Sequence, residues 1–180
     1  MQDEFLLCQS TYLVKASSPI LILDVRQYIW DIGAGTFRPL ERLRFLLLSL
    51  NFEVRQFLSG GKYLPPWRVR GNNISRPTLT LNLQPGEFVE VKTKEEIIAT
   101  LDPNGKNRGL EFTPEMLKFC GKKFRVLKRV DKMMLEETGK LRQISNTVLL
   151  DNVFCDGKCA AGCQRTCYCL WREIWLKRVE

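Results

Sequence analysis

The spacing of the apolar residues changes once along this chain of 180 residues, and that change constrains the fold most strongly. Between residues 22 and 58 apolar side chains recur at steps of three and four, which is the spacing of helices with one buried face. From residue 86 onward they alternate in short runs, which is typical of β-strands. The sequence therefore predicts an α+β protein with its helices first.

The predicted helical segment covers residues 1–61 and is divided by glycines. Residues 33–35 (Gly-Ala-Gly) interrupt the helical spacing, and Gly60 and Gly61 end it. Pro39 falls in the first turn of the second helix, where an N–H has no partner within the helix. We therefore expect two helices, with a break between them at residues 33–35.

Residues 62–85 differ from both flanking regions because they are rich in proline, glycine and asparagine. Such residues favour turns and irregular backbone. We expect a connector that wraps over another element, and we place the domain boundary in it. The remaining domain then covers residues 86–180.

The second domain contains several strand-like runs joined by turn residues. These runs cover residues 88–92, 124–130, 133–135, 141–144 and 147–150. Five short strands of this kind fit a small barrel of the SH3-like type. The final run, residues 170–179, fits either a last strand or a short helix. We expect the four tryptophans to anchor the core, and they are Trp30, Trp67, Trp171 and Trp175.

The composition is that of a soluble globular protein, with 44% hydrophobic and 27% charged residues. No run approaches the roughly 20 apolar residues that a membrane span needs, and no secretory signal is visible. The sequence therefore predicts a cytoplasmic protein. In a reducing compartment, an odd number of cysteines such as the seven found here favours metal or redox chemistry over a disulfide framework.

The cysteines are strongly clustered, and the chain contains no histidine. Five of them fall within fifteen residues, and they are Cys155, Cys159, Cys163, Cys167 and Cys169. Four thiolates are a standard ligand set for structural zinc and also for a [2Fe-2S] cluster, and the spacing does not separate the two. We favour a zinc site with four cysteine ligands. The alternative is a [2Fe-2S] cluster in an electron-transfer or redox-sensing protein, and the competing interpretation is inert thiols.

Our predicted metal ligands are Cys120, Cys155, Cys163 and Cys167. Gly157 and Gly162 favour a loop that folds around an ion, and Cys120 would join this loop to the rest of the domain. Cys159 and Cys169 are the alternative ligands, so the fourth ligand stays open. Cys8, in an apolar context, is expected to be a buried free thiol.

A run of basic residues indicates a different possible function. The net charge is +8, and a dense group of cations comprises Lys122, Lys123, Arg125, Lys128 and Arg129. Such a group can contact phosphates, so a nucleic-acid-binding module of the SH3/KOW-like type is an alternative function. The competing interpretation is a solvated strand face whose outward positions are basic.

Catalysis has little support in the sequence. Without histidine, the most common general base and the usual activator of a serine or cysteine nucleophile are absent. No glycine-rich phosphate loop of the Walker or dinucleotide form is present. The sequence therefore favours a non-catalytic interaction or accessory module whose partner is another protein.

Several strings in the second domain carry a resemblance to a known family. They are GEFVEV (86–91), EEIIATLD (95–102), NRGL (107–110), EM (115–116), FCG (119–121), FRV (124–126) and WREIWLKRV (171–179). With these strings the chain resembles a poorly characterised bacterial family of SH3-like barrels with a Cys-rich C-terminal loop. The resemblance implies shared cysteines at Cys120, Cys155 and Cys163, and in some members at Cys167, but no catalytic residue. It also implies a context in bacterial sugar-polymer or natural-product pathways.

Overall fold

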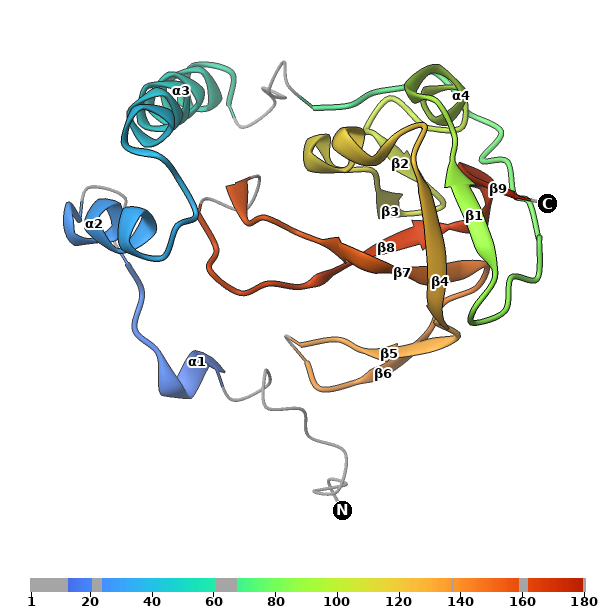
Figure 1. Ribbon diagram of the computed structural model, residues 1–180. Coiled ribbons are helices and arrows are strands. Elements are labelled where there is room, and N and C mark those ends of the chain that lie inside the picture. The colour runs from blue at the N-terminus through green and yellow to red at the C-terminus, as the bar shows by residue number, and fades with distance from the viewer. Residues whose placement is uncertain (1–12, 21–23, 61–67, 137, 159–161, 180) are drawn as a thin grey trace.

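The order of the structural elements follows the change in apolar spacing. The computed structural model describes residues 13–20, 24–60, 68–136, 138–158 and 162–179. Helices α1 (Leu13–Ala16), α2 (Arg26–Gly33) and α3 (Pro39–Leu58) come first, and an antiparallel sheet follows (Figure 1). The prediction of an α+β protein is confirmed, and α3 begins at Pro39 as expected.

The pairing of α2 with α3 depends on a buried ion pair. Arg42 Nε on α3 lies 2.8 Å from Asp31 Oδ2 on α2, and both side chains are more than nine-tenths buried. The Arg42 guanidinium also lies over the ring of Tyr28, 4.4 Å from its centroid. Both charges are removed from water here, so each depends on the other, and this contact constrains how the two helices meet.

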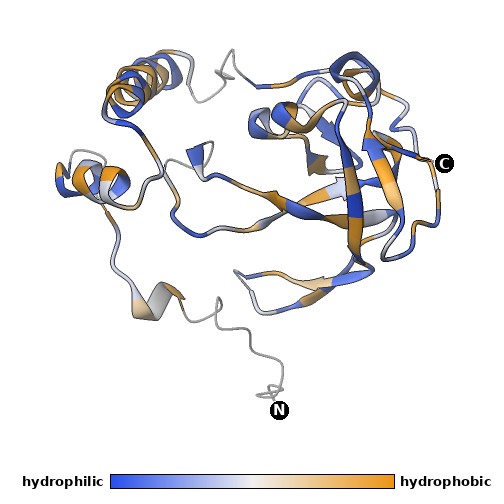
Figure 2. Ribbon diagram, in the orientation of Figure 1, coloured by the Kyte–Doolittle hydropathy of each residue, from blue (hydrophilic) through white to orange (hydrophobic). Residues whose placement is uncertain are grey.

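Helix α3 carries an exposed apolar face. Six exposed residues follow one another at alternating steps of three and four, and they are Leu40, Leu43, Leu47, Leu50, Val54 and Phe57. Figure 2 shows the hydrophobic segments of α3 on a helix that lies apart from the sheet. Among the described residues, no helix combines the length and the apolar character that crossing a membrane requires.

The main sheet has five antiparallel strands in the order β8-β7-β4-β1-β9. They are β1 (Phe88–Val91), β4 (Lys123–Arg129), β7 (Thr147–Phe154), β8 (Tyr168–Arg172) and β9 (Leu176–Arg178). The two outer strands, β8 and β9, are consecutive in the chain and are joined by the 3-10 turn η5 (Glu173–Trp175). The final run therefore forms two strands and a turn, and the sheet curls so that one short turn links its two edges.

Shorter elements accompany the main sheet. Two ribbons pair β2 (Lys106–Asn107) with β3 (Leu110–Glu111), and β5 (Lys132–Met134) with β6 (Leu141–Gln143). Helix α4 (Lys94–Ile98) and the 3-10 helix η3 (Pro114–Phe119) lie between strands. The strand-like runs predicted at residues 133–135 and 141–144 pair as the antiparallel ribbon of β5 and β6.

The core of the sheet is built around two tryptophans. Trp171 and Trp175 are fully buried, and both meet the ring of Phe112 edge-on at centroid distances of 6.1 and 5.3 Å. These two predicted core anchors are confirmed. The prediction for Trp30 is wrong, because α2 turns Asp31 toward α3 and leaves Trp30 48% exposed. Trp67 lies outside the described residues.

A buried carboxylate fastens the connector to the sheet. Glu173 is 0% exposed, and its oxygens accept hydrogen bonds from the N–H groups of Leu81, Asn82 and Leu83 at 2.7–3.1 Å. Arg129 Nη1 on β4 donates to the same carboxylate at 2.8 Å. Residues 68–87 contain no helix or strand, so this carboxylate supplies the partners that a ladder of backbone hydrogen bonds would otherwise give.

We predict that Glu173→Ala destabilises the protein by roughly 3–5 kcal/mol, the usual cost of breaking a buried ion pair from one side. The substitution leaves Arg129 and three backbone N–H groups without their acceptor. Urea unfolding measures the change. The matched control is Asp131→Ala, which removes the exposed carboxylate that pairs with the same arginine. It should cost less than about 1 kcal/mol, and equal losses in the two variants would contradict the role given to Glu173.

Candidate functional site

The Cys-rich loop leaves the sheet after β7 and returns at β8. The last ladder pair is Phe154 with Tyr168, and one further hydrogen bond runs from the Cys155 N–H to the carbonyl oxygen of Cys167 at 2.7 Å. Cys155 and Cys167 therefore face each other at the base of the loop. This pairing brings together two of the four predicted ligands, which lie twelve residues apart along the chain.

Two glycines shape the loop above this base. The Gly157 N–H donates to Cys155 Sγ at 3.3 Å, and the Gly162 N–H donates to the Gly157 carbonyl oxygen at 3.0 Å. Gly157 has φ +74°, and a Cβ there would lie 1.9 Å from the carbonyl oxygen of Cys163. Only glycine fits this close approach. The backbone of Cys163, the third predicted ligand in this segment, is thus packed against the turn that follows Cys155.

The Cys-rich loop also contacts elements on both sides of it. Lys158 Nζ lies 3.1 Å from Glu41 Oε2 on α3. Gly162 packs against the Asp31 carboxylate of α2, because a Cβ at Gly162 would lie 2.8 Å from Asp31 Oδ2. On the other side, Lys118 Nζ of η3 lies 2.8 Å from Asp156 Oδ2. The loop is therefore a junction between the helical segment and the sheet, and Figure 1 shows the segment after β7 extending toward α2.

Acidic side chains surround the first cysteine of the loop. Glu115 Oε2 accepts a hydrogen bond from the Asp156 N–H at 3.1 Å. Burial first, and then the hydrogen bond and charge of Glu115, raise the pKa of Cys155 to about 11, against an opposing effect of the Gly157 N–H. Burial, followed by the charges of Glu115 and Cys155, raises the pKa of Cys169 to about 12. Both groups are therefore neutral thiols at neutral pH when no metal is bound.

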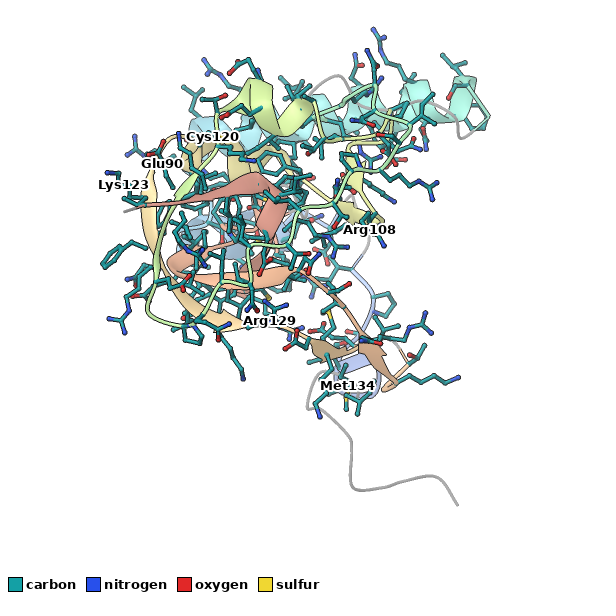
Figure 3. The ribbon with its side chains drawn as sticks, turned by 90° about the vertical axis from the view of Figure 1, so that its right-hand side faces the viewer. Glu90, Arg108, Cys120, Lys123, Arg129 and Met134 are labelled. Carbon is teal, nitrogen blue, oxygen red and sulfur yellow. The ribbon has the colours of Figure 1, made fainter. Side chains whose placement is uncertain are left out.

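The fourth predicted ligand, Cys120, has different neighbours. It caps the C-terminal end of η3 and is labelled in Figure 3. Burial raises its pKa, as does the charge of Glu95 on α4, while Lys94 opposes this change. The charged groups around Cys155 are instead Glu115 and Asp156. The structure therefore gives Cys120 and Cys155 separate electrostatic surroundings.

The complete ligand set stays a prediction. Within the described ranges, no three Cys, Asp or Glu side chains lie close enough to hold a metal ion. The alternative ligand Cys159 and the predicted free thiol Cys8 both lie outside those ranges. Cys169 is buried on β8, and it lies near enough to Cys155 for a charge on Cys155 to raise the pKa of Cys169.

The basic run does not form one free surface. Lys122, Lys123, Arg125 and Lys128 are exposed on or beside β4. Arg129, by contrast, forms ion pairs with the buried Glu173 and with Asp131, so its charge is compensated by these two carboxylates. Figure 3 places Lys123 and Arg129 well apart. Nucleic-acid binding by this run stays a prediction, and it would rest on the four exposed cations and not on Arg129.

Comparisons with known proteins add no family to this picture. No protein-family model, curated protein or solved structure matches the chain. The resemblance to a bacterial SH3-like family therefore stays a prediction. The function has to be inferred from the residues and contacts of the chain itself.

Sequence reasoning missed two charged residues that the structure makes important. Arg172 and Glu173 are both buried although both are charged, and they lie between two tryptophans in a run of core residues. A charge inside an apolar run is a signal in itself, because a buried charge must find a partner. Glu173 meets this need with Arg129 and three backbone N–H groups, whereas Arg172 has no carboxylate partner among the described residues.

We predict that iodoacetamide labels Cys163 before Cys155 and Cys169 in the metal-free protein at pH 8. Cys163 is exposed, whereas a pKa of about 11 leaves the thiolate fraction of Cys155 on the order of one in a thousand. Mass spectrometry of the digested protein gives the order, and urea-unfolded protein serves as the control because its thiols are equally accessible. Labelling of Cys155 as fast as that of Cys163 would contradict the burial and the acidic neighbours described for Cys155.

Proposed function

We propose that this protein is a non-catalytic metal-binding module in which a zinc ion, bound by four cysteines, holds the junction between the helical segment and the sheet. The observation that carries the proposal is the position of the Cys-rich loop. Its residues contact Asp31 and Glu41 in the helical segment, and Lys118 beside the sheet. An ion bound there would fix a joint between two parts of the chain.

The contacts that the loop makes with the helices are weak without an ion. The Lys158–Glu41 pair is exposed at both side chains, and exposed ion pairs contribute little to stability. Structural zinc, in contrast, binds small thiolate sites with an apparent free energy of roughly 10–16 kcal/mol near neutral pH. Because all four proposed ligands lie between residues 120 and 167, a metal would stabilise the Cys-rich loop itself, and the ordered loop would in turn hold its contacts with Asp31 and Glu41.

The chemistry of the available donors fits zinc. The chain has no histidine, so soft ligands must be thiolates, and four thiolates form a closed structural zinc set. Cys155, Cys163 and Cys167 would hold the ion, with Cys120 as the fourth ligand and Cys159 or Cys169 as alternatives. The N–H of Gly157 already points to Cys155 Sγ, and such a donor stabilises a thiolate. When bound, the ion supplies cross-linking and no reaction step.

The sheet would serve as an SH3-like barrel. Support comes from the strand order β8-β7-β4-β1-β9 and from the 3-10 turn η5 between the last two strands. This arrangement puts the two edge strands on consecutive stretches of chain, which favours closure. The Cys-rich loop would then close one side of the barrel.

The partner would be another protein that presents a helix. The exposed apolar residues of α3, from Leu40 to Phe57, repeat at alternating steps of three and four. This is the repeat with which two helices pack along a shared seam. By ordering the Cys-rich loop, the ion would hold the Lys158–Glu41 contact through which the loop reaches α3, so that the partner meets one defined surface.

We predict that protein purified without oxygen or chelators contains one equivalent of zinc and is colourless. Cys163→Ser should reduce the metal content to less than about a tenth of an equivalent and lower the melting temperature, because the closed thiolate set is broken. The matched control is Cys8→Ser, which removes a thiol outside the cluster and should keep the metal. Elemental analysis, a visible spectrum and thermal unfolding provide the data.

Other results would change the assignment. A brown protein with iron and visible absorption would replace zinc with a [2Fe-2S] cluster on the same thiols. Less than about a tenth of an equivalent of both metals in the wild-type protein would overturn the proposal, since a structural site should be close to fully occupied. Equal metal loss in Cys8→Ser and Cys163→Ser would also overturn the ligand set.

A further inference from the structure

A cavity lies where the connector meets the sheet, away from the Cys-rich loop. It has a volume of about 180 Å³, and its lining includes Thr78, Asn107, Arg108, Ser145 and Arg172. A second hollow of about 400 Å³ shares Arg108, Ser145 and Arg172 with it and adds Arg76. Three arginines therefore line one connected region.

Arg172 is a buried cation with only neutral partners among the described residues. It is 8% exposed, and Nη1 donates to the Ser145 carbonyl oxygen at 2.7 Å and to Thr147 Oγ1 at 3.2 Å. Nη2 donates to the carbonyl oxygen of Arg108 at 3.1 Å, and Nε finds no acceptor in the described part of the chain. These oxygens orient the guanidinium but do not neutralise its charge. A buried charge without a counter-ion is costly, so a ligand that supplies negative charge here would be stabilising.

The nearest carboxylate in the sequence cannot supply the missing charge. Glu173 follows Arg172 directly, but its oxygens are occupied by Arg129 and by backbone N–H groups of the connector. The ion pairs of the described residues include none that involves Arg76, Arg108 or Arg172. The cavity therefore has positive charge that the described part of the protein leaves uncompensated.

Arg76 and Arg108 stand at the exposed edge of this region in a strained backbone conformation. Their φ angles are +51° and +48°, in the left-handed region that favours glycine. Asn146, which lines the same cavity, has φ +50°. Strain of this kind concentrates at ligand-binding sites, where the surrounding structure holds it in place. Burial lowers the pKa of Arg172, and the charge of Arg108 lowers it further, as expected for cations that face each other without an anion.

We propose that this cavity binds the phosphate group of a small phosphomonoester, with Arg172 at its base and Arg108 and Arg76 at its mouth. Guanidinium groups match phosphate oxygens in geometry, and the charge-assisted hydrogen bonds they form are strong. A phosphomonoester carries about −1.5 to −2 charges near neutral pH, which suits several converging cations better than a singly charged carboxylate or phosphodiester does. Hydroxyl and amide groups of Thr78 and Asn146 add neutral polar contacts at the wall.

The test is titration calorimetry of the 180-residue protein with inorganic phosphate and with glycerol phosphate at constant ionic strength. We expect binding of one equivalent of each, and a loss of at least about tenfold in affinity for Arg108→Gln, whose side chain is exposed. The matched control is Lys128→Gln, which removes one exposed positive charge on β4 and should bind phosphate like the wild type.

Three results would overturn the proposal. The first is the absence of binding of either phosphate compound at concentrations up to about 10 mM, a weak limit for a charge-assisted site. The second is an equal loss in Arg108→Gln and Lys128→Gln, which would indicate attraction by net charge alone. The third is a single-stranded RNA without a terminal phosphate that binds more tightly than phosphate in an Arg108-dependent manner, because the ligand would then be a nucleic-acid backbone.

Discussion

The buried carboxylate of Glu173 is the interaction on which the rest of the structure depends. It joins three distant parts of the chain, because it binds the connector through Leu81–Leu83, β4 through Arg129, and its own turn η5. A carboxylate at 0% exposure is stable only with a full set of donors, and four hydrogen bonds provide it here. Because Glu173 is held, its neighbours are held too, with Trp175 in the core and Arg172 at the cavity.

A second constraint acts where the Cys-rich loop meets the helical segment. The loop is closed at its base by Cys155 and Cys167, and it contacts Asp31 and Glu41. The buried core supports the sheet, whereas the helical segment meets the loop through these polar contacts. Because these polar contacts are weaker than a buried core, a metal ion that orders the loop would strengthen the attachment of the helical segment. The phosphate cavity lies in a separate place and uses none of the thiols.

The spacing of apolar residues predicted where α3 and strands β1, β4 and β7 lie in the chain, but it did not predict that the apolar face of α3 is exposed. It did not predict that η5 would divide the final run, because Arg172 and Glu173 look like solvent-facing residues until their partners are known. The prediction that Trp30 anchors the core was also wrong, since a tryptophan on an amphipathic helix is buried only if a partner covers it. The cysteine loop was predictable as a loop from its glycines. The separate surroundings of Cys120 and Cys155 depend on the path of η3 in space, which sequence distance does not encode.

The central claim is that thiolates of this chain converge on one ion. X-ray absorption at the zinc edge of the anaerobically purified protein tests it most directly. The expected result is a first shell of four sulfur atoms at about 2.3 Å, the distance of zinc–thiolate bonds. A first shell dominated by oxygen at about 2.0–2.2 Å would contradict the claim, because the ion would then be held by carboxylates or water.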